Sequence, residues 1–369
     1  MRRKKSISKI GEKIESILNR KEIELIAKEV GFVSRKSNLM GSDFLYLNIQ
    51  GIGSCGFSSL TELCIQLKKD YEITISKQGL DERYHNKSSE FLKTILMRIL
   101  SARLEMSLDL TKLGVFQGIY LRDATSSQIP SCFSDLFKGS GGSASKAGLK
   151  IELSYDIKGD KIDIEFRDGA SSDSTSKDVE FEQDGLYLQD LGYFKLKRFK
   201  KIISRNAYFI SRYKYPTNIY DHVDDSKRKR TEKQKDKQIT LKTLTKRMKV
   251  NEIRVQNICL GMYERVPVRL LIQKLPKKVA DKRKRKLREE ARKKRYSLSE
   301  DRIKLCEYTL LISNIEAEVL TNEQIIQTYG IRWQIEIMFK CWKSVLKFGI
   351  MHPMKPERFL SMLYGHMIW

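Results

Sequence analysis

The chain contains few of the residues that stabilise small metal-binding or disulfide-linked folds. Its 369 residues include only six cysteines and four histidines. The two cysteines nearest in sequence, Cys55 and Cys64, are nine positions apart, too far for the short spacing of a zinc-binding pair. Zinc ribbons, zinc fingers and disulfide frameworks are therefore disfavoured. We interpret the cysteines as ordinary thiols of a reduced compartment.

Long apolar runs are missing as well. No segment approaches the roughly 18 uncharged apolar residues that a membrane-spanning helix requires. The basic start, from Met1 to Lys5, leads into a charged stretch instead of the apolar core of a secretory signal. These absences predict a soluble, cytoplasmic protein that has no membrane partner.

Negative charge is scarce relative to positive charge. The chain has 71 lysine and arginine residues against 46 aspartate and glutamate residues, which gives a net charge of +25. Because 40% of its residues are hydrophobic, the chain can bury real cores, and its length suits roughly two or three domains. A folded, basic protein is expected to bind a polyanion. Nucleic acid fits better than a membrane surface, because no segment joins the charge to a strong amphipathic apolar face.

Residues 1–105 are predicted to be helical. Ser59 and Glu62 have the spacing of a capping box at the start of a helix whose apolar residues recur every three to four positions. A second helix is expected over 76–84, and together the two resemble a helix-turn-helix that could meet DNA. A small helical bundle with a polar surface explains the same pattern equally well.

The pattern changes to that of strands and alternating helices farther along. Strand-like runs at 115–121 and 186–189 each lead to an aspartate, Asp123 and Asp190. This order predicts an α/β sheet in which two strands each present an aspartate at their carboxyl end. The other elements expected here are a hairpin between 149 and 166, a helix over 195–203 and a strand over 207–211.

Positive charge concentrates between residues 221 and 300. This window has 27 lysine and arginine residues against 11 acidic ones, and its densest run is Lys282, Arg283, Lys284, Arg285 and Lys286. Strand character at 252–260 and 266–273 predicts an inserted, partly β segment that carries a basic arm. We favour contact with nucleic acid, because unbalanced charge repels itself without a polyanion; a solvated charged helix is the alternative.

A long helix is predicted from Thr321 to about Phe348. Tyr329, Arg332, Glu336 and Lys343 fall within a wedge of roughly 60° on it, because each residue advances about 100°. Periodicity alone would permit a simple surface ion pair between Arg332 and Glu336.

The spacing of these four residues is more specific than their shared face. It matches the pattern Y-x2-R-x3-E-x6-K and therefore resembles the signature of the insertion-sequence transposases of family four. Two further segments, Tyr120 to Thr125 around Asp123 and Leu188 to Phe194 around Asp190, are similar to the first and second aspartate boxes of that family.

The resemblance implies a DNA transposase that performs cut-and-paste transposition by two-metal phosphoryl transfer. Its core would be a ribonuclease-H-like mixed sheet flanked by helices, interrupted by the basic insertion and preceded by an all-α region. Asp123, Asp190 and Glu336 would be the catalytic carboxylates that hold two Mg²⁺ ions, for which Mn²⁺ should substitute. Asp123 would lie between both ions, and each of the other two would complete one.

The same resemblance assigns contacts to DNA. Arg332 and Lys343 would hold phosphates near the scissile bond, and Tyr329 would add a hydroxyl contact. Tyr308 stands where the family often has a tryptophan that stacks on a base turned out of the duplex, and a tyrosine could still stack. A residue of a buried strand is the alternative for Tyr308.

The chain is expected to have four parts and two kinds of partner, which are double-stranded DNA and a second copy of the chain. Double-stranded DNA would be bound as terminal repeats and as target, by a homodimer on paired ends that needs no small-molecule cofactor and associates with the bacterial nucleoid. The parts are a helical DNA-end-binding region (1–105), a first part of the catalytic core (106–220), the basic insertion (221–305) and a second part of the core (306–369).

The C-terminal segment carries an apolar helical pattern that stops at Trp369 without a cap. From this we expect a truncated copy in which part of that apolar face, or the surface it should cover, is exposed. The alternative function is then a catalytically inactive DNA-binding remnant that inhibits the intact enzyme. A related nuclease that cleaves without rejoining is a third possibility.

Overall fold

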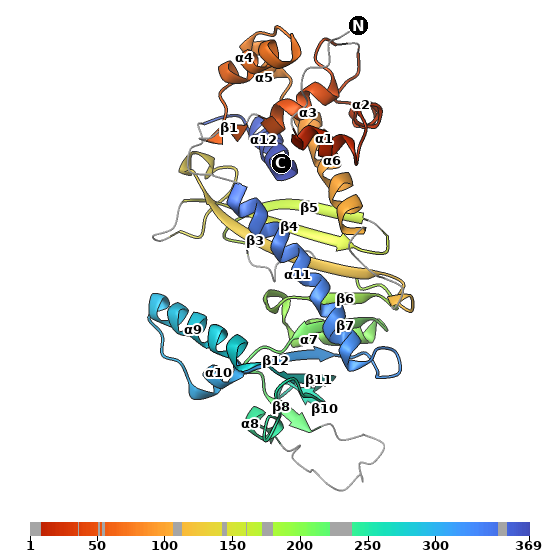
Figure 1. The fold of residues 1–369 in the computed structure, drawn as a ribbon, viewed down its shortest axis with the longest axis vertical. Coiled ribbons are helices and arrows are strands. Elements are labelled where there is room, and N and C mark those ends of the chain that lie inside the picture. Colours follow the sequence, from red (N-terminus) through yellow and green to blue (C-terminus); the bar gives the residue numbers. More distant parts are fainter. Residues whose placement is uncertain are drawn as a thin grey trace. The chain divides into compact units, whose positions relative to one another are not determined.

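The computed structural model forms two compact units (Figure 1). The first contains Met1–Asp109, Asp123–Ser172 and Gln334–Trp369, and the second contains Leu110–Arg122 and Asp173–Trp333. The structure describes residues 9–35, 37–50, 52–53, 56–105, 113–141, 146–159, 161–171, 180–221, 238–345 and 353–369. Residues 222–237 of the expected basic insertion therefore lie outside the described residues.

Helices dominate the N-terminal part of the first unit. The capping box at Ser59 is confirmed, since its Oγ accepts from the Glu62 N–H and the Glu62 carboxylate accepts from the Ser59 N–H. Asn19 and Glu22 make a second capping box, which we did not predict. The helices are α1 (Lys9–Glu15), α2 (Arg20–Glu29), α3 (Gly41–Gln50), α4 (Leu60–Tyr71), α5 (Lys77–Glu82) and α6 (Asn86–Glu105), with the short strands β1 (Ile52–Gly53) and β2 (Gly56–Phe57) between α3 and α4.

The C-terminal helix α12 (Pro356–Ile368) packs against α3 and α6 in the interior of this helical part (Figure 1). Phe359 and Leu363 are fully buried, and the Ser88 and Ser361 hydroxyls are hydrogen-bonded at 3.0 Å. A Cβ at Gly365 would lie 2.7 Å from the Asn48 carbonyl oxygen, so glycine is needed for this close approach. The expectation that the apolar face of this helix stays exposed is therefore wrong for these residues, because α3 and α6 cover it.

The first unit also holds an antiparallel hairpin of β4 (Ala147–Asp156) and β5 (Lys161–Asp168), with β4 between β5 and β3 (Ile119–Ile129). The hairpin was predicted and is confirmed. Phe166 on β5 packs against Tyr364 of α12, with ring centroids 4.8 Å apart. Phe133, in the short 3₁₀ helix η2 (Ser131–Phe133), packs against Phe359 at 4.5 Å.

The second unit is built on a mixed sheet in the order β3-β6-β7-β12-β11-β10-β8-β9. The first residues of β3 pair in parallel with β6, and β6 pairs in parallel with β7; the remaining neighbours are antiparallel. The strands are β6 (Leu186–Gln189), β7 (Tyr208–Arg212), β8 (Ile219–Asp221), β9 (Gln238–Ile239), β10 (Ile253–Leu260), β11 (Val266–Lys274) and β12 (Tyr308–Ser313). The helical elements are η4 (Leu191–Tyr193), α7 (Leu196–Ser204), α8 (Leu241–Leu244), α9 (Lys277–Lys294), α10 (Glu300–Leu305) and α11 (Asn322–Val345), which continues into the first unit.

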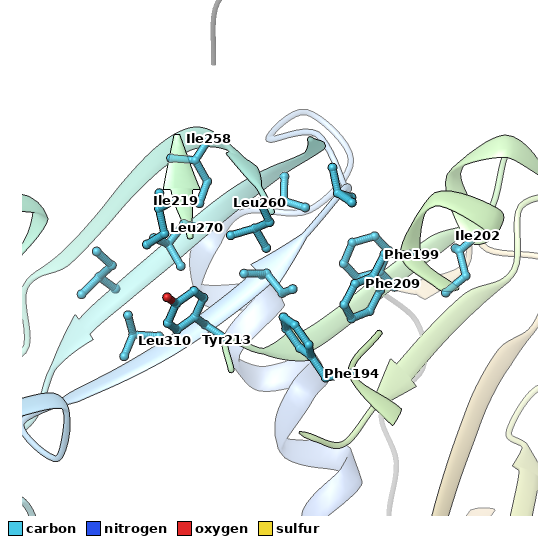
Figure 2. Packing of buried hydrophobic residues seen from close by; sticks show 14 of the residues in the cluster. Phe194, Phe199, Ile202, Phe209, Tyr213, Ile219, Ile258, Leu260, Leu270 and Leu310 are labelled. Atoms are coloured by element: carbon cyan, nitrogen blue, oxygen red, sulfur yellow. The ribbon is translucent and has the colours of Figure 1, made fainter. Parts of the chain in front are cut away.

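An aromatic cluster forms the core of the second unit where α7 meets the sheet (Figure 2). Phe199 of α7 stacks on Phe209 of β7 with a centroid distance of 4.4 Å, and Phe194 meets Phe199 edge-on at 5.1 Å. The expected α/β class, with a mixed sheet flanked by helices and a helical N-terminal region, is confirmed.

Two local expectations need correction or refinement. The strand that carries Asp123 does not end there: β3 continues to Ile129, so Asp123 lies inside a strand, and only the pairing with β6 stops at Arg122. The strands predicted within the insertion are present as β10 and β11, and the predicted basic arm is a regular helix, α9.

Two absences in the sequence have counterparts among the described residues. No helix there is long and apolar enough to cross a membrane. The cysteines that the structure describes carry free thiols; they are Cys64, Cys132, Cys259, Cys306 and Cys341.

Burial of His366 in α12 predicts a pH-dependent stability. Its side chain is 3% exposed, and burial lowers its pKa from 6.5 to about 4. The unfolded chain therefore takes up this proton first, so the free energy of unfolding should fall as the pH drops from about 6.5 towards about 4, by up to about 3 kcal/mol. Thermal unfolding measured across this range should show a steeper loss for the unmodified chain than for His366→Gln. Parallel curves would show that another group causes the acid sensitivity.

Candidate active site

The parallel pairing of three strand segments in the second unit stops in register. Arg122 of β3 is paired with Gln189 of β6, and Gln189 is paired with Ser211 of β7. Parallel strands present their carboxyl ends at the same edge of a sheet, which is where α/β proteins place functional groups. The residue after each of these positions is charged: Asp123, Asp190 and Arg212, respectively.

Asp190 is joined to the signature helix by a chain of polar contacts. Its Oδ1 lies 3.6 Å from the Arg332 Nη1, and the Arg332 side chain is 2% exposed. The Arg332 Nε donates to the Tyr329 hydroxyl oxygen at 3.1 Å, and that hydroxyl donates to the Gln189 carbonyl oxygen at 3.4 Å. These contacts attach one face of α11 to the end of β6, so two residues of the Y-x2-R-x3-E-x6-K pattern hold the strand that carries Asp190.

Other guanidinium groups lie around the same strand end. Arg332 and Arg212 stand over the Tyr329 ring, with centroid distances of 5.4 and 5.9 Å. The Tyr193 ring, in η4 directly after Asp190, has two more within about 6 Å: Arg122 at 5.9 Å and Arg198 at 6.0 Å. Guanidinium groups stack on aromatic faces and bind phosphate, so this edge of the sheet suits an anionic substrate.

Sequence reasoning missed several of these residues. Arg212 could have been found from its place at the end of the strand after β6, one position past the register of Gln189 and Ser211. Arg122 and Arg198 gave no such signal, because only the folded chain brings both to the Tyr193 ring.

The Tyr329 hydroxyl makes its hydrogen bonds inside the protein. The side chain is 8% exposed, and burial raises its pKa, an effect that Arg332 and Arg212 oppose. The phenol therefore remains protonated at neutral pH and can donate to Gln189. This placement favours a positioning role for Tyr329 over the direct hydroxyl contact with DNA that the resemblance implied.

The other two candidate catalytic carboxylates, Asp123 and Glu336, belong to the first unit, whereas Asp190 belongs to the second. Asp123 is 8% exposed, and the Ala124 N–H donates to its Oδ1 at 2.8 Å. Glu336 is half-buried on α11, one turn after Arg332, and Lys343 is exposed two turns farther on. In the part of the chain that the structure describes, no group of three or more Asp, Glu, His or Cys side chains is close enough to hold a metal ion. Carboxylate oxygens are nevertheless the donors that Mg²⁺ prefers.

Comparison with known proteins identifies the family of this chain. The family described as "Transposase DDE domain" matches residues 116–368. The chain belongs to the DDE transposases of insertion-sequence family four.

The relatives are similar over nearly all of the chain. It is 30% identical over 383 aligned residues to the transposase for insertion sequence element IS1151 of Clostridium perfringens, an alignment that covers 99% of this chain and 79% of that protein. It is 31% identical to the transposase for IS231B of Bacillus thuringiensis subsp. berliner, with 94% and 75% covered. As a DDE transposase it is an enzyme that acts on DNA, and its family uses divalent metal ions.

Tyr308 of this transposase lies in the core of the second unit. Its side chain is 4% exposed and belongs to the hydrophobic cluster that includes Tyr213 and Leu310. The buried-strand interpretation therefore fits Tyr308 better than stacking on an extruded base, because so little of the residue is exposed.

The five basic residues of α9 at positions 282–286 divide into two groups. The Arg283 Nη1 donates to the Tyr308 carbonyl oxygen at 3.1 Å, and the Lys284 Nζ lies 2.7 Å from a Glu307 carboxylate oxygen. Burial lowers the pKa of Arg283, and the hydrogen bond to Glu307 raises the pKa of Lys284. These two side chains attach α9 to β12. Part of the Arg283 side chain is nevertheless exposed, as are the other three residues: Lys282, Arg285 and Lys286.

The polar chain between α11 and β6 predicts a measurable cost for losing the Tyr329 hydroxyl. Tyr329→Phe removes the donor to Gln189 and an acceptor for Arg332, so the free energy of unfolding should fall by about 1 to 2 kcal/mol. Tyr263→Phe is the matched control, because that side chain is 85% exposed. Chemical denaturation of both variants tests this, and equal midpoints would mean that the contacts at Tyr329 contribute nothing to stability.

Proposed function

We propose that this chain catalyses cut-and-paste transposition of an insertion sequence, with strand cleavage at the element's ends followed by strand transfer. The observation that carries this is the ion pair between Arg332 and Asp190, at 3.6 Å. It links the helix with the transposase signature to the strand with the second aspartate box. The names of the relatives, which are transposases for insertion sequence elements, support the same function.

The catalytic carboxylates in this proposal are Asp123, Asp190 and Glu336. Asp123 and Asp190 each follow a paired position of two neighbouring parallel strands, and Glu336 follows Arg332 by one turn of α11. We assign two Mg²⁺ ions to these residues, with Mn²⁺ as a substitute, because hard carboxylate oxygens suit both metals. When bound, such ions activate the attacking oxygen and stabilise the leaving oxygen of phosphoryl transfer.

The surrounding side chains orient groups and supply positive charge. Arg332 holds the Asp190 carboxylate, and Tyr329 keeps Arg332 in place through its hydroxyl. Arg212 is proposed to contact a phosphate near the scissile bond, because it ends the strand beside β6. Lys343 is exposed on α11 and is proposed, like Arg212, to contact a phosphate near the scissile bond.

The remaining regions are assigned to binding. Residues 1–105 would bind the terminal repeats, α9 in the basic insertion (221–305) would contact the phosphate backbone, and 106–220 with 306–369 would make the catalytic core. Two copies of the chain would pair on the element's ends, and the target would be double-stranded DNA.

Removing one carboxylate should abolish cleavage without abolishing binding. Asp123→Asn, Asp190→Asn and Glu336→Gln should each lower the rate by at least about 100-fold, because loss of residues that merely orient metal ligands already costs about 10- to 100-fold. Glu323→Gln is the control, since Glu323 is exposed in the first turn of the same helix. Cleavage of a labelled duplex bearing the element's end, in Mg²⁺ or Mn²⁺, measures the effect. Full activity in any of the three variants would remove that residue from the metal-binding set.

The exposed cations of α9 should set part of the salt dependence of DNA binding. Replacing Lys282, Arg285 and Lys286 together by Gln should reduce the slope of log affinity against log salt by up to about 3 units, about 0.9 for each phosphate that the variant no longer neutralises. Arg283→Gln and Lys284→Gln should instead lower the melting temperature, because these side chains hold the helix to β12. An unchanged slope in the triple variant would make α9 a solvated helix.

A further inference from the structure

The segment of α7 carries an excess of positive charge that the resemblance did not anticipate. From residue 195 to residue 205 the sequence KLKRFKKIISR contains six cations and no acidic residue. Cations clustered in this way attract a polyanion.

The charge and the apolar residues of α7 occupy opposite faces. Phe199 and Ile202 are fully buried, and Figure 2 shows Phe199 against Phe209 of the sheet. At about 100° per residue, the three exposed lysines fall within a wedge of about 100° on the side opposite these two residues. They are Lys197, Lys200 and Lys201.

One cation of this segment is used differently. The Arg198 guanidinium lies over the Phe181 ring at 4.9 Å and over the Tyr193 ring at 6.0 Å, and its side chain is half-buried. Arg198 therefore helps to fix α7 in place, whereas the three lysines are exposed on the surface.

The position of α7 relates it to the candidate active site. The helix begins after the short 3₁₀ turn η4, and Lys195 is only five residues beyond Asp190. Five residues span at most about 18 Å, and η4 shortens that path. A duplex whose phosphate reaches Asp190 would therefore lie within reach of the first turns of α7.

A turn with exposed side chains packs against the start of α7. A Cβ at Gly261 would overlap the Leu196 side chain, so the turn between β10 and β11 contacts the first residue of the helix. The Arg265 guanidinium stacks over the Tyr220 ring at 3.5 Å, and the Arg265 Nε donates to the Met262 carbonyl oxygen at 3.0 Å. These contacts hold the turn, while Tyr263 at its tip is 85% exposed.

Exposing the apolar ring of a tyrosine to water is unfavourable, but the exposed ring can bind a nucleic acid. Two residues separate Tyr263 from Gly261 by at most about 7 Å of chain, which keeps its ring near the start of α7. An aromatic ring next to a row of cations is the combination with which proteins bind nucleotides, since the cations meet phosphates and the ring stacks on a base.

We propose that α7 and the turn 261–265 form a DNA-contact surface in addition to α9. On this surface Lys197, Lys200 and Lys201 contact the phosphate backbone, and Tyr263 stacks on a nucleotide base that is not paired. The proposal rests on the proposed function as a DNA transposase, and it names the part of the second unit that receives the DNA beside Asp190.

The lysines are tested by salt titration of DNA binding. The variant Lys197→Gln, Lys200→Gln, Lys201→Gln is compared with Lys146→Gln, Lys158→Gln, Lys161→Gln, which removes the same charge from exposed positions around the β4–β5 hairpin. Affinity for a generic duplex is measured without divalent metal over about 50 to 300 mM salt. The slope should fall by up to about 3 units in the α7 variant and stay unchanged in the control. Equal slopes in both variants would overturn the proposal.

Tyr263 is tested with a duplex that contains a short single-stranded gap. Tyr263→Leu should weaken binding by about 5- to 100-fold without changing the salt slope, while Tyr263→Phe, which keeps the ring, should bind as the unmodified chain does. Unchanged affinity in Tyr263→Leu would overturn the stacking contact. If the triple lysine variant does not fold, Lys200→Gln alone should lower the slope by about 0.9.

The readouts separate this proposal from the catalytic one. Failure of the catalytic proposal would appear as full cleavage by the carboxylate variants, which leaves the salt slopes untouched. Failure of the α7 surface would appear as an unchanged slope in metal-free binding, whatever the cleavage rate.

Discussion

A guanidinium with only 2% of its side chain exposed cannot be left without partners, and Arg332 is such a group. Burying an unpaired charge costs several kcal/mol, so the residues around it are constrained together. The Asp190 carboxylate balances its charge, and the Tyr329 hydroxyl accepts its Nε–H. The Tyr329 hydroxyl is in turn held by the Gln189 carbonyl oxygen. The rotation of this part of α11 about its axis follows from this single buried charge.

The same site shows how a basic enzyme can hold acidic groups for a polyanionic substrate. Carboxylates near a DNA backbone repel it unless metal ions and cations offset their charge. In the second unit the guanidinium groups of Arg122, Arg198, Arg212 and Arg332 all lie on the two aromatic rings that flank the end of β6. Aromatic faces hold these side chains in fixed directions, so the positive charge is in place before the substrate arrives.

The first unit depends on close helix packing. Small residues at the contacts of α12, Ser361 against Ser88 and Gly365 against Asn48, let the helix approach α6 and α3 closely. The Trp342 Nε1–H donates to the Met367 carbonyl oxygen at 3.0 Å, which ties the part of α11 in this unit to α12. Asp81 on α5 pairs with Arg358 and Lys355. The C-terminal helix thus connects the N-terminal helices to the helix that carries Glu336.

Local interactions explain what could be read from the sequence by itself. The capping box at Ser59, the β4–β5 hairpin, the strands and helix around Asp190 and the face of α11 shared by Tyr329, Arg332 and Glu336 all depend on residues near one another in the chain. The spacing of the signature, together with the two aspartate boxes, was enough to indicate the transposase family. Only the tertiary structure decided the rest, because long-range pairing and burial determine it. Strand β3 continues past Asp123, and the Tyr308 ring lies in the core. Arg283 and Lys284 attach α9 to β12. Arg122 and Arg198 both lie near the Tyr193 ring. The hydropathy and spacing of a residue indicate which interactions its side chain can make. The neighbours that exclude water from that side chain come from distant parts of the chain.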